Sequence, residues 1–275
     1  MRACRLFVFA ATLASVIAVA PGTGRANPPK HVVSINLCTD QLLVLLADRD
    51  VLRSVTFLSS RPSQSFVADR VREIPVNHGG AEEVLSMRPD LVVAGTFAAR
   101  PAVRMLKRLG VAVLDLPIPE TFDEIRSQIT LLSGALGEEA RGKDMIAEMN
   151  RRLANIVLPH GPRPRALVLG PRGFTSGVGT LVDEVLAAAG LRNVADDLGI
   201  RGYGKVELEE IVAANPDVII LNQARDGAPS LAGGPLTHPA LRRFAGQIVQ
   251  MDSALWTCGG PYTVRAVEFL AAAVQ

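Results

Sequence analysis

The sequence is poor in aromatic and histidine residues, and this limits the ligand sites it can build. Of 275 residues, 4% are aromatic, with one Trp and two Tyr. The four histidines, His31, His78, His160 and His238, are scattered along the chain. Zinc and manganese sites need several nitrogen, sulfur or oxygen ligands close together. We therefore do not expect direct capture of a bare metal ion, and a pocket for an organic ligand must use few rings.

Signature motifs of common enzyme classes are also missing. The chain has no Gly-x-Ser-x-Gly, no His-Glu-x-x-His, no Gly-x-x-x-x-Gly-Lys followed by Ser or Thr, and no Gly-x-Gly-x-x-Gly. These patterns would mark a nucleophile elbow, a zinc protease helix, a phosphate loop and a dinucleotide turn. No residue can be nominated as a nucleophile on this basis, and no cofactor is expected.

The chain has no surplus of charge of either sign. It carries 29 basic and 27 acidic residues, but three of the basic ones, Arg2, Arg5 and Arg25, lie in a terminal segment that we expect to be removed. The remaining 26 basic residues against 27 acidic ones give a net charge of −1. A protein that binds duplex nucleic acid normally carries a basic surplus, so nucleic acid is not an expected partner.

Residues 1–26 have the features of a secretory signal peptide. Arg2 and Arg5 precede an apolar run from Leu6 to Ala20, and small residues precede a cut after Ala26. The alternative is a membrane anchor, but about 15 apolar residues fall short of the ~20 that span a bilayer. Cys4 lies too early for lipid attachment at the cut. We expect an exported protein located in the periplasm.

Two cysteines, Cys38 and Cys258, would remain after cleavage. In an oxidising compartment two cysteines can pair. Whether they do depends on the distance between their Cα atoms, which sequence does not give. A disulfide and two free thiols both remain open.

A helix–strand unit occurs twice in the chain. Residues 82–93 match residues 209–220 without a gap: Glu-Glu, five further residues that continue a short helix, Pro-Asp and an apolar run. Pro ends each helix, and the continuous apolar run is typical of a strand covered on both faces of a parallel sheet. A second match, residues 106–114 with 241–249, follows in the same order. Gene duplication and two similar lobes are indicated.

A helical stretch separates the two copies. Thr121 is a plausible N-cap for a helix over 122–136, Gly137 interrupts it, and apolar residues continue at helical spacing over 138–157. We predict an α/β fold of two lobes, each with a parallel sheet flanked by helices, joined by one long helix. The boundaries are 27–137 for the N-terminal lobe, 138–158 for the connecting helix and 159–275 for the C-terminal lobe. Such a helix would resist hinge closure.

Together these features resemble the helical-backbone (class III) solute-binding proteins of ABC importers, which carry ferric siderophores, cobalamin or haem. The resemblance covers residues 31–270. It implies a monomer that binds a metal chelate between its lobes and delivers it to a permease dimer with ATPase subunits. It further implies that a glutamate on each lobe, here Glu82 and Glu209, docks onto permease arginines. An exported sensor or enzyme built on the same fold is the alternative.

Ligands of open α/β sheets bind beyond the carboxyl ends of the strands. Loops expected there supply the candidate ligand contacts Cys38, Thr39, His78, Phe97, Arg172, Phe174, Tyr203 and Trp256. Large rings suit a flat or bulky organic ligand. Cobalamin-binding relatives tend to carry Trp where this chain has Gly95, which weakens that choice. A ferric siderophore is the first expectation, with cobalamin or haem next.

Overall fold

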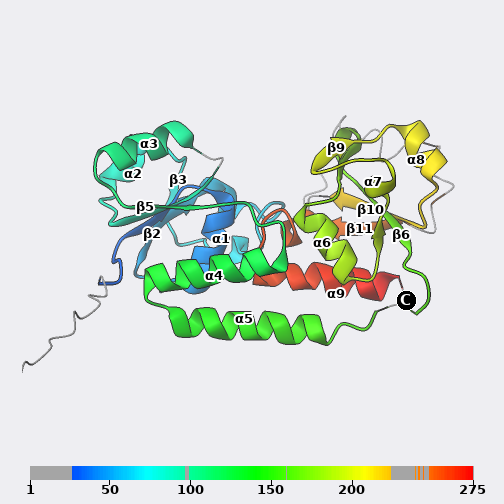
Figure 1. The fold of residues 1–275 in the computed structure, drawn as a ribbon. Coiled ribbons are helices and arrows are strands. Elements are labelled where there is room, and N and C mark those ends of the chain that lie inside the picture. The colour runs from blue at the N-terminus through cyan, green and yellow to red at the C-terminus, as the bar shows by residue number, and fades with distance from the viewer. Residues whose placement is uncertain are drawn as a thin grey trace, which may run out of the picture.

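The computed structural model describes residues 27–96, 99–158, 160–223 and 248–274, together with Pro239, Leu241 and Phe244. Two sheets lie side by side, each with helices around it (Figure 1). The sheet of the N-terminal lobe has five parallel strands in the order β3-β2-β1-β4-β5. Its elements are β1 (Val32–Ser34), α1 (Leu37–Leu46), β2 (Leu52–Thr56), β3 (Val76–Asn77), α2 (Ala81–Ser86), β4 (Leu91–Gly95), α3 (Arg100–Arg108) and β5 (Val113–Leu116), with short 3-10 turns η1 (Phe57–Ser60) and η2 (Ala68–Arg70).

The C-terminal lobe has a four-stranded parallel sheet in the order β11-β10-β6-β8. Its elements are β6 (Arg165–Leu169), α6 (Leu181–Ala188), β8 (Arg192–Asn193), α7 (Val194–Asp197), α8 (Leu208–Ala214), β10 (Val218–Gln223), β11 (Ile248–Asp252) and α9 (Val264–Ala273), with the turns η3 (Pro171–Gly173), η6 (Ser253–Leu255) and η7 (Pro261–Thr263). A separate antiparallel ribbon pairs β7 (Phe174–Ser176) with β9 (Tyr203–Lys205). The prediction of two lobes with parallel sheets is confirmed.

The repeated unit occupies the same place in both lobes. Its helices are α2 and α8, and its strands are β4 and β10, each paired with the first strand of its lobe. The residue before each Pro, Arg88 or Asn215, has a left-handed backbone, a conformation that commonly ends helices; proline also disfavours the right-handed helical region for its predecessor. The two Asp residues also act alike: Asp90 carboxylate oxygens accept from the Lys30 and His31 amides, and Asp217 accepts from the Arg165 amide. Each Pro-Asp therefore ends a helix and fixes the entry of the lobe's first strand.

The stretch between the lobes forms two helices that pack together, α4 (Phe122–Leu136) and α5 (Glu139–Ala154). The Thr121 side chain caps α4 by accepting from the Glu124 amide, and Gly137 ends it with a left-handed backbone, as predicted. The helix α5 runs beneath both lobes and ends four residues before the predicted boundary at Leu158 (Figure 1).

One apolar core continues from lobe to lobe at the base of the molecule. It contains side chains of α1, α4, α5, α6 and α9, including the buried Leu42, Ile129, Met149, Val185 and Val267. Each lobe has a smaller core of its own on the far side of its sheet. The lobes are thus joined by packing as well as by chain connections, which opposes large relative motion. No helix within the described ranges is long and apolar enough to cross a membrane, and the predicted signal peptide lies outside those ranges.

Candidate functional site

A cavity of about 300 Å³ lies between the lobes, and we call it the inter-lobe cavity. It opens where β1, β4 and β5 of the N-terminal lobe end, and its opposite wall comes from the C-terminal lobe. Most of the wall is apolar. It is lined by Asn36, Cys38, Thr39, Leu42, Gly95, Thr96, Leu116, Pro117, Ile118, Pro119, Gln128, Leu181, Tyr203, Trp256, Thr257, Cys258 and Gly259. This is the position where open α/β sheets bind ligands.

The first turn of α1 and the end of β4 form one wall. Asn36 is the N-cap of α1, and its Oδ1 accepts from the amides of Cys38 (2.9 Å) and Thr39 (3.3 Å). Gly95 lies against this cap, so that a Cβ on Gly95 would be 2.7 Å from Asn36 Cγ. Only glycine fits without displacing the cap. The same contact explains why a large ring cannot stand at position 95 in this chain.

The segment that leaves β5 forms a second wall. Pro117, Ile118 and Pro119 precede α4, and Ile118 is 53% exposed although it lines the cavity. Gln128 of α4 supports the segment by donating from Nε2 to the Pro117 carbonyl at 2.7 Å. This segment therefore offers a rigid apolar surface to a ligand.

The two aromatic residues of the cavity come from the C-terminal lobe and differ in exposure. Tyr203, on β9, is 68% exposed. Partial burial, and then the nearby Glu120 carboxylate, raise the pKa of the Tyr203 phenol above its ordinary value, so it stays a neutral hydrogen-bonding group at neutral pH. Trp256 is only 3% exposed, and its indole N–H donates to Asn222 Oδ1 at 3.0 Å. Tyr203 is thus the ring most accessible to a ligand.

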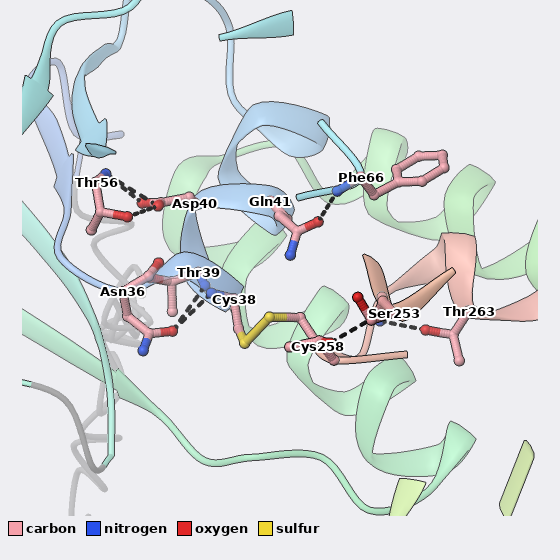
Figure 2. The surroundings of a disulfide bond; sticks show 12 residues. Asn36, Cys38, Thr39, Asp40, Gln41, Thr56, Phe66, Ser253, Cys258 and Thr263 are labelled. Atoms are coloured by element: carbon pink, nitrogen blue, oxygen red, sulfur yellow. Dashed lines mark hydrogen bonds between the residues drawn. A yellow bond between two sulfur atoms is a disulfide. The ribbon is translucent and has the colours of Figure 1, made fainter. Parts of the chain in front are cut away.

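Cys38 and Cys258 form a disulfide, which resolves the open alternative. Their Cα atoms are 5.1 Å apart and their positions in the chain differ by 220 residues. Cys38 belongs to α1 and Cys258 to the turn between η6 and η7 (Figure 2). The bond therefore links the two lobes at the cavity wall, and both cysteines line the cavity.

A buried carboxyl group lies in the same turn of α1. Asp40 has no exposed surface and accepts hydrogen bonds from the Thr56 amide (3.1 Å) and the Thr56 hydroxyl (2.5 Å). Burial raises the pKa of Asp40 to about 7, against the opposing effect of hydrogen bonds from Ser34 and Thr56. Asp40 does not line the cavity; it fixes α1 against the end of β2.

The predicted contacts divide into two groups. Cys38, Thr39, Tyr203 and Trp256 gather at the inter-lobe cavity, whereas His78, Arg172 and Phe174 do not line it, and Phe97 lies outside the described residues. The His78 ring stacks on Phe57 and its Nδ1 is 3.5 Å from a Glu83 carboxylate oxygen. Phe174 is half exposed beneath the Lys205 ammonium, and Arg172 is an exposed residue with a left-handed backbone.

The two glutamates of each repeated unit have different surroundings. Glu83 accepts from the His78 amide, and Glu210 accepts from the Glu207 amide, both at 2.8 Å. These second glutamates therefore cap the starts of α2 and α8. Glu82 and Glu209 are exposed at the second position of each helix, without a hydrogen bond or ion pair to another described residue.

The cavity wall that the structure describes carries no side chain that is charged at neutral pH. Nor do the described residues contain a group of three or more His, Cys, Asp or Glu side chains able to hold a metal ion. An ionised ligand group buried here would have no counter-charge on this wall, and burying an unpaired charge is costly. The arrangement suits binding of a ligand face that is uncharged and largely apolar.

Comparisons with known proteins agree with this geometry. Residues 32–236 match the model of the periplasmic binding protein family. This chain belongs to that family. It is 26% identical over 261 residues to an uncharacterized ABC transporter substrate-binding lipoprotein of Bacillus subtilis, a match that covers 90% of this chain and 80% of the relative. It is 27% identical over 209 residues to a cobalamin-binding protein of Halobacterium salinarum, which covers 73% of this chain but only 56% of that relative.

A solved structure gives the same fold. The periplasmic heme-binding protein RhuT from Roseiflexus sp. RS-1 superposes with a TM-score of 0.73 at 24% identity, covering 89% of this chain and 97% of that one. This confirms the two-lobed α/β architecture. Together with the family match over residues 32–236, the resemblance to class III binding proteins is confirmed.

Several cavity residues had not been singled out from the sequence. Asn36, Thr257 and the segment 117–119 belong to this group. Asn36 was detectable as a helix N-cap, because Asn is a preferred residue at that position. The Pro-Ile-Pro segment has no comparable signal, since its role depends on the path it takes between the lobes.

Proposed function

We propose that this chain is the periplasmic substrate-binding component of an ABC importer and that it captures an organic metal chelate in the inter-lobe cavity. The observation that carries the proposal is the cavity itself, which joins the carboxyl ends of one lobe's strands to an aromatic wall of the other. The similarity to an ABC transporter substrate-binding lipoprotein of Bacillus subtilis supports the transport role. Export by cleavage after Ala26 is part of the proposal.

The chelate is proposed to present an uncharged face to the cavity. A ferric siderophore of the neutral type is the first choice, and cobalamin or haem comes next. The uncharged described wall supports this order, because a chelate with several ionised groups would lose hydration without gaining a partner. Tyr203 supplies a ring and a neutral phenol to orient the ligand.

A titration against a panel of chelates tests this assignment. The mature protein is mixed with an uncharged ferric trihydroxamate, cobalamin, haem and ferric citrate, and the fluorescence of its single Trp is followed, with equilibrium dialysis to correct for absorbance by the ligands. We expect the uncharged trihydroxamate to bind with a Kd of about 1 μM or tighter, which corresponds to about −8 kcal/mol. Ferric citrate should bind at least about tenfold more weakly.

Two aromatic substitutions make a matched pair for this titration. Tyr203→Ala removes the exposed ring of the cavity and should weaken binding about tenfold or more, equivalent to at least ~1.4 kcal/mol. Phe174→Ala removes a half-exposed ring outside the cavity and should leave the Kd unchanged. Failure of every chelate to bind would exclude the proposed function, and equal losses in the two variants would exclude the proposed cavity.

Glu82 and Glu209 are proposed to dock onto the permease. Their neighbours Glu83 and Glu210 are occupied in helix capping, while Glu82 and Glu209 are exposed on one helix of each lobe. An exposed ion pair contributes only ~0.2–1 kcal/mol, so two contacts far apart would serve to orient the protein and speed its encounter with the permease.

Charge reversal tests this docking role. The double variant Glu82→Arg with Glu209→Arg should keep its ligand affinity and lose uptake in cells that carry the partner permease. The double variant Glu73→Arg with Asp196→Arg changes the charge equally at exposed positions and should transport normally. Uptake that survives the first double reversal would refute the docking assignment.

A further inference from the structure

The disulfide joins two parts of the cavity wall that are otherwise held by different lobes. On the N-terminal lobe, the first turn of α1 is fixed by its own side chains. The Thr39 hydroxyl shares a 2.7 Å hydrogen bond with Ser34. Asp40 accepts from Thr56, and Gln41 Oε1 accepts from the Phe66 amide at 2.7 Å (Figure 2). Cys38 is therefore held rigidly relative to the sheet of its lobe.

Cys258 is held equally firmly on the other side. The neighbouring Trp256 is bonded to Asn222 at the end of β10, and the Thr257 hydroxyl donates to the Ser253 carbonyl at 2.7 Å. Because both ends of the bond are fixed to their own lobes, the disulfide sets the spacing between the α1 wall and the Trp256–Gly259 wall.

Contacts next to the bond show how closely the walls meet. A Cβ on Gly259 would lie 2.3 Å from Pro119 Cγ and 3.0 Å from Ile125 Cγ1. The segment that carries Cys258 is thus pressed against the chain leaving β5. A small separation of the lobes at this point would open that contact and enlarge the cavity.

We propose that the Cys38–Cys258 disulfide is a redox-sensitive latch of the ligand cavity. In the oxidised protein the bond holds the two walls at the spacing that binds ligand. In the reduced protein the walls separate more easily and the ligand dissociates faster. This inference rests on the proposed function, since it assigns a regulator to the same binding site.

The chemistry requires a dithiol reductant. Its thiolate attacks one cysteine sulfur, the S–S bond breaks, and a mixed disulfide forms with release of the other cysteine thiolate. The second thiol of the reductant then displaces the protein sulfur, so that the reductant leaves as a disulfide and the protein holds two thiols. Cys258 is buried at 1% exposure and Cys38 is half-buried. Attack is therefore favoured at Cys38, from the cavity side.

Ligand and latch must act on each other reciprocally. If reduction weakens ligand binding by a given factor, then bound ligand must disfavour reduction by the same factor. A ligand in the cavity would in addition cover the Cys38 sulfur. The latch therefore makes the loaded protein harder to reduce than the empty one.

Dissociation kinetics provide the main test. The probe is one uncharged trihydroxamate. Its ferric complex is used with the Cys38→Ser/Cys258→Ser double variant. Its redox-inert gallium(III) complex is used with wild-type protein reduced by a dithiol. Stopped-flow Trp fluorescence should show dissociation about tenfold faster than from the oxidised protein, with the association rate little changed; this lies within the usual range of coupling between sites. Bound gallium chelate should also slow reduction of the disulfide.

A matched control separates this effect from loss of stability. Leu106→Ala removes a fully buried side chain of the N-terminal lobe that does not line the cavity. It should destabilise the protein and leave the dissociation rate within about twofold, as expected for independent sites. If this control accelerates dissociation as much as loss of the disulfide does, the latch is refuted.

Hydrogen exchange of the ligand-free protein gives a second readout that does not need binding. Reduction should speed exchange of the amides of residues 37–41 and 256–260 and leave those of β4 and β10 unchanged. Equal ligand dissociation from the oxidised and reduced forms overturns the latch. If the oxidised protein binds no chelate, the proposed function fails instead. The latch is then tested by hydrogen exchange alone, and it is refuted if reduction leaves the exchange rates of residues 37–41 and 256–260 unchanged.

Discussion

Substitution of Asp40 by Asn should remove most of the pH dependence that this one carboxyl group gives to folding. Asp40 is fully buried on α1 and accepts hydrogen bonds from Thr56. Burial disfavours its charged form and raises the pKa to about 7 from its ordinary value of 3.8. In the unfolded chain the group is solvated and titrates near 3.8.

The sign and size of the effect follow from this difference. Below about pH 4 the carboxyl is protonated in both states, and its contribution to stability is fully present. Between about pH 4 and pH 7 the unfolded chain has lost the proton while the folded protein keeps it, so stability falls as pH rises. Each pH unit is worth 1.36 kcal/mol, and a shift of about three units gives about 4 kcal/mol. Above about pH 7 both states are ionised and the loss is complete.

Urea unfolding of oxidised protein at intervals from pH 4 to pH 8 measures this effect. Asn keeps one oxygen for the Thr56 amide and cannot ionise, so the stability of Asp40→Asn relative to wild type should rise by about 4 kcal/mol across the range. Asp50→Asn, the same change at an exposed position, should show no such rise. A difference between Asp40→Asn and wild type that stays constant from pH 4 to pH 8 would show that Asp40 is not held with a raised pKa.

Three further outcomes are expected. Gly95→Ala places a Cβ 2.7 Å from Asn36 Cγ and should cost about 1 kcal/mol by disturbing the helix cap; Gly134→Ala, which meets nothing within 4 Å, should be neutral or slightly stabilising in the same thermal unfolding experiment. Asp90→Ala and Asp217→Ala remove equivalent acceptors at the starts of β1 and β6 and should each cost ~1–3 kcal/mol in urea unfolding; a loss in only one lobe would contradict their equivalence. Small-angle scattering should show a change in radius of gyration below about 1 Å on ligand binding, because the lobes share a packed base; a larger shrinkage would contradict that.

The sequence was most informative where a residue's role is local or repeated. Thr121 and Gly137 mark the two ends of α4 as predicted, because capping depends on a few neighbouring residues. The repeated Pro-Asp unit was the most reliable guide to the two lobes. Its two copies lead into equivalent strands, β4 and β10, each of which pairs with the first strand of its lobe. The apolar spacing alone predicts the start of α1 at Gln41, four residues after its actual start at Leu37, because polar residues in the first turn hide the apolar period. The β7–β9 ribbon was missed altogether, because its strands have three residues each.

The candidate site was predictable only in part, because it is made by tertiary contact. Strand ends are visible in sequence, and they led to Cys38, Thr39, Tyr203 and Trp256, which do line one cavity. The pairing of Cys38 with Cys258 needs a Cα distance across the lobes, and no local pattern supplies it. His78, Arg172 and Phe174 follow strands in the same way but lie elsewhere, since a strand end fixes the edge of a sheet and not the direction of each loop.

The first turn of α1 shows why a single short segment can serve several parts of the site at once. An α-helix turns by about 100° per residue, so four consecutive side chains point in four directions. Here Cys38 reaches the C-terminal lobe, Thr39 the strand β1, Asp40 the end of β2, and Gln41 the Phe66 amide at the base. A carboxylate suits position 40 because both of its oxygens accept from the Thr56 amide, although burial makes its ionisation unfavourable. The same contact holds Cys38 in place, so the stability lost at Asp40 between about pH 4 and pH 7 and the rigidity of the disulfide have one structural origin.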